Sequence, residues 1–142
     1  MAYSHILVGL DLSEDCMAVL RKAVALAKNC NAKLSLVHVI EPLAISYGGD
    51  MALDIGVIQE QQTSSAMSAL KKLVSDLNFP VYQEHVLIGQ AADEMHYLAK
   101  EENCDLILVG SHGRKGFALL LGSTPNSVLH GAECDVLAVF VK

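Results

Sequence analysis

The sequence predicts an α/β fold, an open five-stranded and mostly parallel sheet with helices on both faces. Over 142 residues, five short β-prone apolar runs alternate with segments of helical periodicity, and no repeat or linker interrupts them. The apolar fraction is 52% and Trp is absent, a composition typical of strands that are covered on both faces. Length and composition together predict one domain, residues 1–142, with a sizeable core.

The first elements predict a βαβ unit. Residues 5–10 form an apolar strand, Ser13 is the expected N-cap of the next helix, and residues 33–40 form a second strand. One face of the helix carries the apolar residues Met17, Leu20, Val24 and Ala27. Two strands joined in this way are expected to be parallel, with a right-handed connection.

Residues 42–57 contain one proline and three glycines without a clean period, so we expect a long loop there. A helix is predicted over 57–77, then a strand over 81–88, whose polar alternation indicates an edge position. A third helix is predicted over 90–102.

Residues 105–109 are almost purely aliphatic and predict an interior strand. A last helix is expected over about 125–132, and a fifth strand over 135–141. In open parallel sheets, ligands bind beyond the carboxyl ends of the strands, where the strand order reverses. The candidate site residues therefore follow the first, second and fourth strands: Asp11, Val39 to Pro42, and Gly110 onward.

The passage Gly110-Ser111-His112-Gly113-Arg114-Lys115-Gly116 and the later Gly122-Ser123-Thr124-Pro125 suggest an anion site. The glycines allow a ligand to approach the backbone closely. Thr124 is the expected N-cap of the last helix and Pro125 its first residue, and a helix start offers unpaired N–H groups to an anion. The competing interpretation is that these glycines only end a strand and begin a helix.

The net charge of −6 argues against a nucleic-acid backbone or an anionic membrane as the main partner. We expect a cytoplasmic protein, because the start of the chain resembles no signal peptide and no apolar run is long enough to span a membrane. The four cysteines form no CxxC pair, which favours reduced thiols. The six histidines have no metal-binding spacing, so no metal site is predicted.

Four segments resemble the universal stress protein family, in particular its small single-domain, ATP-binding class. They are Tyr3 to Ser13 (YSHILVGLDLS), Ala32 to Val39 (AKLSLVHV), Cys104 to Arg114 (CDLILVGSHGR) and Cys134 to Val139 (CDVLAV). The resemblance covers nearly the whole chain. It implies a Rossmann-like fold of the adenine nucleotide alpha hydrolase-like type.

ATP-binding members of that family carry G-x2-G, nine residues, then G followed by Ser or Thr. The resemblance implies that the ribose and phosphates contact Gly110, Gly113, Gly122, Ser123 and Thr124, with His112 and Arg114 as further candidates. It places adenine against Leu10, Asp11 and the backbone of Val39, and leaves room at Gly89 beside the ribose. Eight residues, not nine, separate Gly113 from Gly122, and Asp11 also suits a simple turn.

The leading hypothesis is a non-enzymatic regulator of the stress response that binds an adenine nucleotide, either ATP or AMP or ADP, with Mg²⁺ as a candidate companion. An interaction protein of the same fold without a nucleotide, and a weak ATPase, are the alternatives. No nucleophile elbow, P-loop or GxGxxG is present, so no catalytic residue is predicted. The apolar strand 135–141 predicts a homodimer through an exposed sheet edge.

Overall fold

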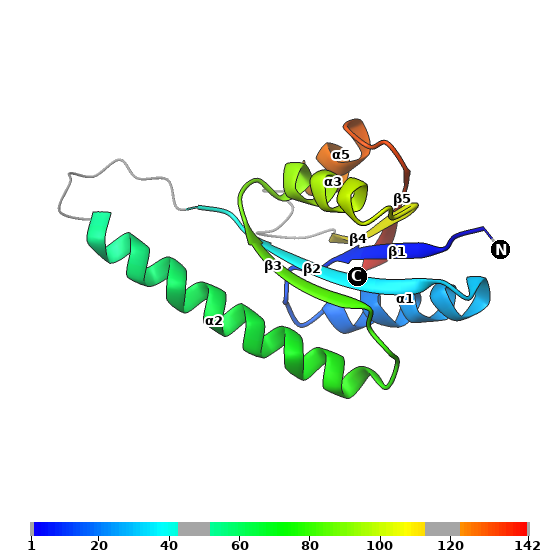
Figure 1. Cartoon of the computed structure of the whole chain (residues 1–142), viewed down its shortest axis with the longest axis horizontal. Helices are drawn as coiled ribbons and strands as arrows, with labels where there is room; N and C mark the ends of the chain where they lie inside the picture. The colour runs from blue at the N-terminus through cyan, green and yellow to red at the C-terminus, as the bar shows by residue number, and fades with distance from the viewer. Residues whose placement is uncertain (1, 43–51, 113–122, 142) are drawn as a thin grey trace.

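The computed structural model describes residues 2–42, 52–112 and 123–141. Its five strands form one parallel sheet in the order β3-β2-β1-β4-β5 (Figure 1). The strands are β1 (His5–Gly9), β2 (Lys33–Ile40), β3 (Gln83–Ile88), β4 (Leu106–His112) and β5 (Asp135–Val141). The predicted fold class is confirmed, as are the edge position of β3 and the interior position of β4.

The helices cover both faces of the sheet, as expected. They are α1 (Cys16–Cys30), α2 (Ala52–Leu77), α3 (Ala91–Glu101) and α5 (Ser123–His130). In Figure 1, α1 and α2 lie below the sheet, and α3 and α5 lie above it. α3 and α5 pack against each other, α3 over β2 and β4 and α5 over β4 and β5.

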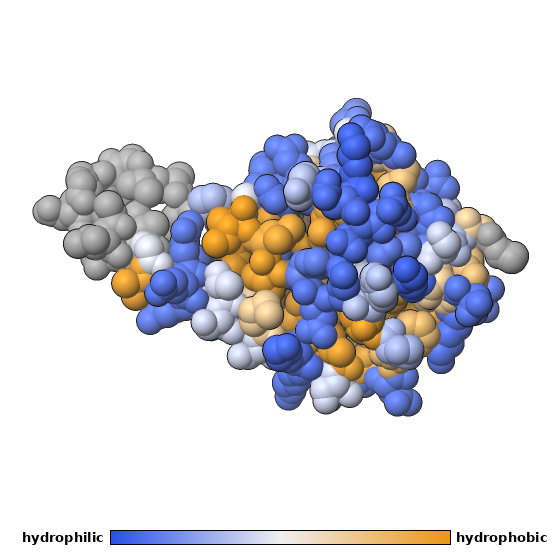
Figure 2. Space-filling model, in the orientation of Figure 1, coloured by the Kyte–Doolittle hydropathy of each residue, from blue (hydrophilic) through white to orange (hydrophobic). Residues whose placement is uncertain are grey.

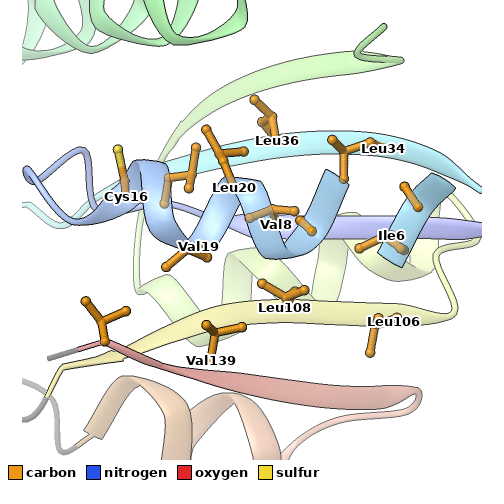
Figure 3. Packing of buried hydrophobic residues seen from close by; sticks show 14 of the residues in the cluster. Ile6, Val8, Cys16, Val19, Leu20, Leu34, Leu36, Leu106, Leu108 and Val139 are labelled. Atoms are coloured by element: carbon orange, nitrogen blue, oxygen red, sulfur yellow. The ribbon is translucent and has the colours of Figure 1, made fainter. Parts of the chain in front are cut away.

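Alternate side chains of β1 point into two apolar cores. Ile6 and Val8 pack in the core between α1 and the sheet, where Figure 3 shows Val8 near Leu20 and Ile6 further along the strand. Leu7 points to the opposite face of the sheet and packs with Ile107 in the core between α3 and the sheet. All three β1 side chains are fully buried, and burial of a residue of this size contributes about 1.5–3 kcal/mol.

Three helix starts differ from the predictions. α1 begins at Cys16 with Asp15 as its N-cap, because Ser13 is used in the preceding turn, where its Oγ accepts from the Asp15 N–H at 3.3 Å. α2 begins at Ala52 and includes Gly56, so the expected loop is shorter than 42–57. Gly56 has nothing within 4 Å of an added Cβ, and a glycine costs only about 1 kcal/mol in an exposed helix.

The third difference is at α5. The helix begins at Ser123, so Thr124 is its second residue rather than its N-cap, and Pro125 is its third. Proline is tolerated in the first turn of a helix because N–H groups there have no partner within the helix. β4 is also longer than predicted and continues through Gly110, Ser111 and His112, which pair with β5.

The four cysteines are free thiols, as expected from their spacing. Burial raises the pKa of Cys104 to about 12, and the neighbouring Cys134 adds to the effect. The thiol is therefore protonated at neutral pH and a poor nucleophile. Across the parts of the chain that the structure describes, none of the helices combines the length and hydropathy that crossing a bilayer requires.

A polar cluster joins three strands at the amino end of the sheet. The buried His5 ring contacts Ser35 Oγ at 2.7 Å through Nε2 and the Glu102 carbonyl at 3.1 Å through Nδ1. The Asp105 carboxylate accepts from the backbone N–H groups of Ser4 and His5. Burial acts to raise the pKa of Asp105, but these hydrogen bonds outweigh it and hold the pKa below its usual value.

His5 makes folding stability depend on pH. Burial lowers the pKa of His5 from 6.5, so the unfolded chain binds a proton before the folded chain does. Stability is therefore present in full above pH 6.5 and decreases as the pH falls from there toward the folded-state pKa. We expect His5→Gln to reduce this decrease, measured as the free energy of unfolding in urea between about pH 8 and 5.

The matched control is His130→Gln, because His130 is exposed. The control is expected to keep the pH dependence of the wild-type protein. A decrease in stability of equal size in wild-type and His5→Gln proteins contradicts the prediction.

Candidate functional site

The strand order places a reversal between β1 and β4. The chain leaves β1 through α1 on one face of the sheet and leaves β4 toward α5 on the other. Gly9 and Val109 are the last pair between β1 and β4, so Leu10 and Gly110 each follow directly after that pair. In open parallel sheets such a reversal opens a crevice at the carboxyl ends of the strands. The predicted residues after β1 and β4 thus begin at the same edge of the sheet.

At the end of β1, Leu10 is buried and its backbone polar groups are paired within the protein. The residue is 5% exposed as a whole and belongs to the core between α1 and the sheet. Its N–H donates to the Val37 carbonyl at 2.9 Å, and its carbonyl accepts from His38 Nδ1 at 2.7 Å. A carbonyl can only accept, so this contact places a proton on Nδ1 of His38.

Asp11 takes part in a turn, which was the alternative role expected for it. Its Oδ1 accepts from the Ser13 N–H at 2.9 Å. Leu12 follows with a φ of +60°, a left-handed conformation that is uncommon for a leucine. Strained backbone of this kind clusters at functional sites, where surrounding contacts maintain it.

At the end of β2, Val39 borders a cavity of about 590 Å³ between the sheet and α2. Apolar and polar side chains line it: Leu12, His38, Val39, Ile40, Glu41, Ile58, Gln61, Gln62, Ser65, Ala66 and Ala69. In Figure 2 the helices on the viewed face are mostly hydrophilic, with an apolar area near the end of β3, where Ile88 is 44% exposed. The carboxyl end of the sheet is therefore hollowed and partly apolar.

Gly89 follows β3 with a φ of +156°, a region that favours glycine, and its N–H donates to the Ile40 carbonyl at 3.0 Å. α3 starts directly after Gly89, and backbone N–H groups at its start already donate to side chains of this protein. Glu41 Oε2 accepts from the Ala91 N–H at 3.1 Å, and Gln90 Oε1 accepts from the Asp93 N–H at 3.2 Å. With Asp93 and Glu94 in its first turn, the start of α3 is unsuited to a further anion.

The start of α5 is the other helix start on this face of the sheet. The structure describes Ser123 and Thr124 as its first two residues, and Gly110 and His112 as the end of β4. No acidic residue lies in the first turn of α5, unlike that of α3. Gly113, Arg114 and Gly122 lie outside the described residues. The described part of the predicted anion site thus consists of one strand end and one helix start.

Sequence reasoning missed three features of this edge: the His38 contact with Leu10, the Glu41 contact with α3 and the left-handed Leu12. Each depends on segments distant in sequence or on one backbone angle, so no local pattern indicates it. Among residues 2–42, 52–112 and 123–141, no three His, Cys, Asp or Glu side chains gather in a group that could hold a metal ion.

The model of the Universal stress protein family (Usp) matches residues 2–139. This chain belongs to the universal stress protein family. It is 43% identical over 143 residues to Universal stress protein A homolog 1 of Coxiella burnetii (strain RSA 493 / Nine Mile phase I), a match that covers 100% of this chain and 99% of that protein.

Two solved structures share the fold. Universal stress protein UspA from Lactobacillus plantarum superposes with a TM-score of 0.83 at 22% identity, covering 98% of this chain and 99% of that one. A universal stress protein crystallised in complex with cAMP superposes with a TM-score of 0.67 at 26% identity, covering 100% of both chains. The Rossmann-like fold implied by the resemblance is therefore confirmed.

His38 should stabilise the turn after β1. We expect His38→Leu to lower the free energy of unfolding by about 1–3 kcal/mol, because the Leu10 carbonyl loses its donor. His38→Asn should recover much of this loss, since an Asn amide can donate from nearly the position of Nδ1. Urea denaturation measures both variants. Equal destabilisation by Leu and Asn contradicts a role for the hydrogen bond.

Proposed function

We propose that this universal stress protein binds an adenine nucleotide at the carboxyl ends of β1, β2 and β4 and acts as a regulator of the stress response in the cytoplasm. The observation that carries the proposal is the strand-order reversal between β1 and β4, where Leu10 and Gly110 follow directly after the last pair of the two strands, Gly9 and Val109. A family relative of 26% identity, crystallised with cAMP, supports the ligand class.

In this proposal, adenine lies against the backbone of Leu10 and Val39, with Asp11 beside it. The N–H and carbonyl of Leu10 are already paired with Val37 and His38, so adenine would pack against Leu10 without a hydrogen bond to it. Val39 borders the cavity. Gly89 borders the ribose, and its backbone angle admits no ordinary side chain without strain. A cavity lined by both apolar and polar side chains suits a small molecule that has an apolar ring and polar groups.

The phosphates are proposed to lie toward α5. Gly110, His112, Gly113, Arg114 and Gly122 supply backbone groups and positive charge, and Ser123 and Thr124 supply hydroxyls and N–H groups at the helix start. The occupied and acidic start of α3 leaves α5 as the better anion site of the two. ATP is the first candidate, with AMP or ADP as alternatives and Mg²⁺ as a companion of the phosphates.

We propose nucleotide binding, and not ATP hydrolysis, as the function of the site. ATP hydrolysis needs a positioned water and a metal that carboxylates hold. In the described part of the chain, no cluster of acidic, histidine or cysteine side chains of that kind is found. A weak ATPase therefore remains the less supported alternative.

An interaction protein with no nucleotide is the second candidate function. The eight residues between Gly113 and Gly122 depart from the family spacing of nine. Pro125, in the first turn of α5, removes one N–H donor from the proposed anion site. Both features weaken phosphate binding.

Calorimetry separates these candidates. ATP titrated into protein freed of ligand is expected to give measurable heat and a higher Tm, because a ligand stabilises the state that it binds. Ser123→Ala should weaken the affinity by about three- to tenfold through the loss of one hydroxyl. Ser68→Ala, on the exposed surface of α2, is the matched control and should change nothing. If millimolar ATP produces no heat and no shift in Tm, the proposed function is refuted.

A homodimer through β5 is the proposed assembly. β5 lies at the edge of the sheet, with β4 on one side only. Two of its large apolar residues are exposed, Leu137 by 39% and Phe140 by 74%. An open apolar edge of this kind pairs readily with a second chain.

Light scattering at micromolar concentration tests the dimer. We expect the mass of two chains for the wild-type protein and of one chain for Phe140→Asp, because a charge at the interface opposes association. Tyr97→Asp is the matched control, since Tyr97 is an aromatic side chain on α3 with 61% exposure. A monomeric wild-type protein contradicts the prediction.

A further inference from the structure

α5 packs against α3, β4 and β5, and little of its second half is buried. The helix has eight residues, and Val128 is fully buried in the core under α3, with Met95 and Leu98 among its neighbours. Ser127 is half-buried, whereas Leu129 and His130 are exposed. Within the described residues, a single buried apolar side chain thus fixes the second half of α5.

A hydrogen bond from α3 adds to this anchor. His96 Nε2 lies 2.7 Å from the Val128 carbonyl, and because a carbonyl can only accept, Nε2 carries the proton and donates. Val128 is the third residue from the end of α5, where carbonyls have no partner within the helix. His96 therefore caps the C-terminal end of α5 from the neighbouring helix.

Gly131 allows the His96 ring to approach. A Cβ at Gly131 would lie 2.6 Å from Cε1 and 2.9 Å from Nδ1 of His96, closer than real Cβ contacts. The nearest atoms belong to a planar ring that the Val128 carbonyl holds, so the ring cannot turn aside and keep its hydrogen bond. The absence of a side chain at Gly131 is thus a condition for the bond.

We propose that His96 and Gly131 are positioning residues for the phosphate end of the nucleotide site. The inference rests on the proposed function, in which the first turn of α5 contacts the phosphates. An eight-residue helix is about 12 Å long and moves as one body, so an anchor at Val128 also fixes the N–H groups at Ser123 and Thr124. The attraction between an anion and a helix start is confined to the first turn and is sensitive to its placement.

The test compares ATP with adenosine, which lacks phosphates. We expect His96→Leu to weaken ATP binding by about tenfold and to leave adenosine affinity within about twofold of wild type, because only the phosphates depend on α5. His96→Gln should restore most of the ATP affinity, since a Gln amide can donate from nearly the position of Nε2. Gly131→Ala should act like His96→Leu, and Gly56→Ala, with open space around its Cβ, is the control.

Amide hydrogen exchange supplies a measurement without nucleotide. In His96→Leu and Gly131→Ala, the amides of α5 should exchange about tenfold faster than in wild type, and those of α1 should be unchanged. Should His96→Leu not fold, His96→Gln and Gly131→Ala carry the same comparison.

The outcomes separate the proposals. Equal losses of ATP and adenosine affinity indicate a general structural role and overturn the inference, as does unchanged exchange in α5 together with unchanged ATP affinity. If the wild-type protein binds neither ligand, the proposed function fails and the phosphate role fails with it. In that case, faster exchange in α5 still supports His96 and Gly131 as its anchor, and unchanged exchange refutes it.

Discussion

β1 lies at the centre of the sheet, with every residue from His5 to Gly9 buried, and it pairs in parallel with β2 on one side and β4 on the other. Because both faces of this interior strand are covered, Ile6 and Val8 enter one apolar core and Leu7 enters the other. The double pairing of β1 also places Leu10 and Gly110 directly after the last β1–β4 pair, at the edge of the sheet on which the proposed nucleotide site depends. The polar contacts of His5 and Asp105 hold the other end of the same strands.

Local sequence patterns were sufficient for most of the fold. The predicted strands at 33–40 and 135–141 match β2 and β5 residue for residue. β2 lies inside the sheet and is mostly buried, as its apolar sequence indicates, whereas β5 is an edge strand whose apolar residues are partly exposed. Helix starts were harder to predict. Ser13 has the chemistry of an N-cap but is used in a turn, and Thr124 lies one residue inside α5. Capping residues and turn residues are the same types, so composition alone does not separate them.

The proposed nucleotide site could likewise be predicted only in part. Its proposed location rests on the alternation of strands and helices and on the glycine-rich passage, both of which are visible in the sequence. The contacts that organise it, from His38 to Leu10, from Glu41 to Ala91 and from His96 to Val128, each join residues that are far apart in the chain. A single sequence shows each of these side chains but not its partner.

The pairing of β1 with β4 has a consequence for how the chain folds. β1, β2 and β3 are consecutive, so they can assemble early, whereas Ile6 meets Leu106 only after 100 further residues have been made. Contacts over such a separation close late because chain entropy opposes them. Until β4 has been synthesised, one edge of β1 has no partner strand. A partly synthesised chain of β1, β2 and β3 therefore exposes a strand edge that can associate with other chains.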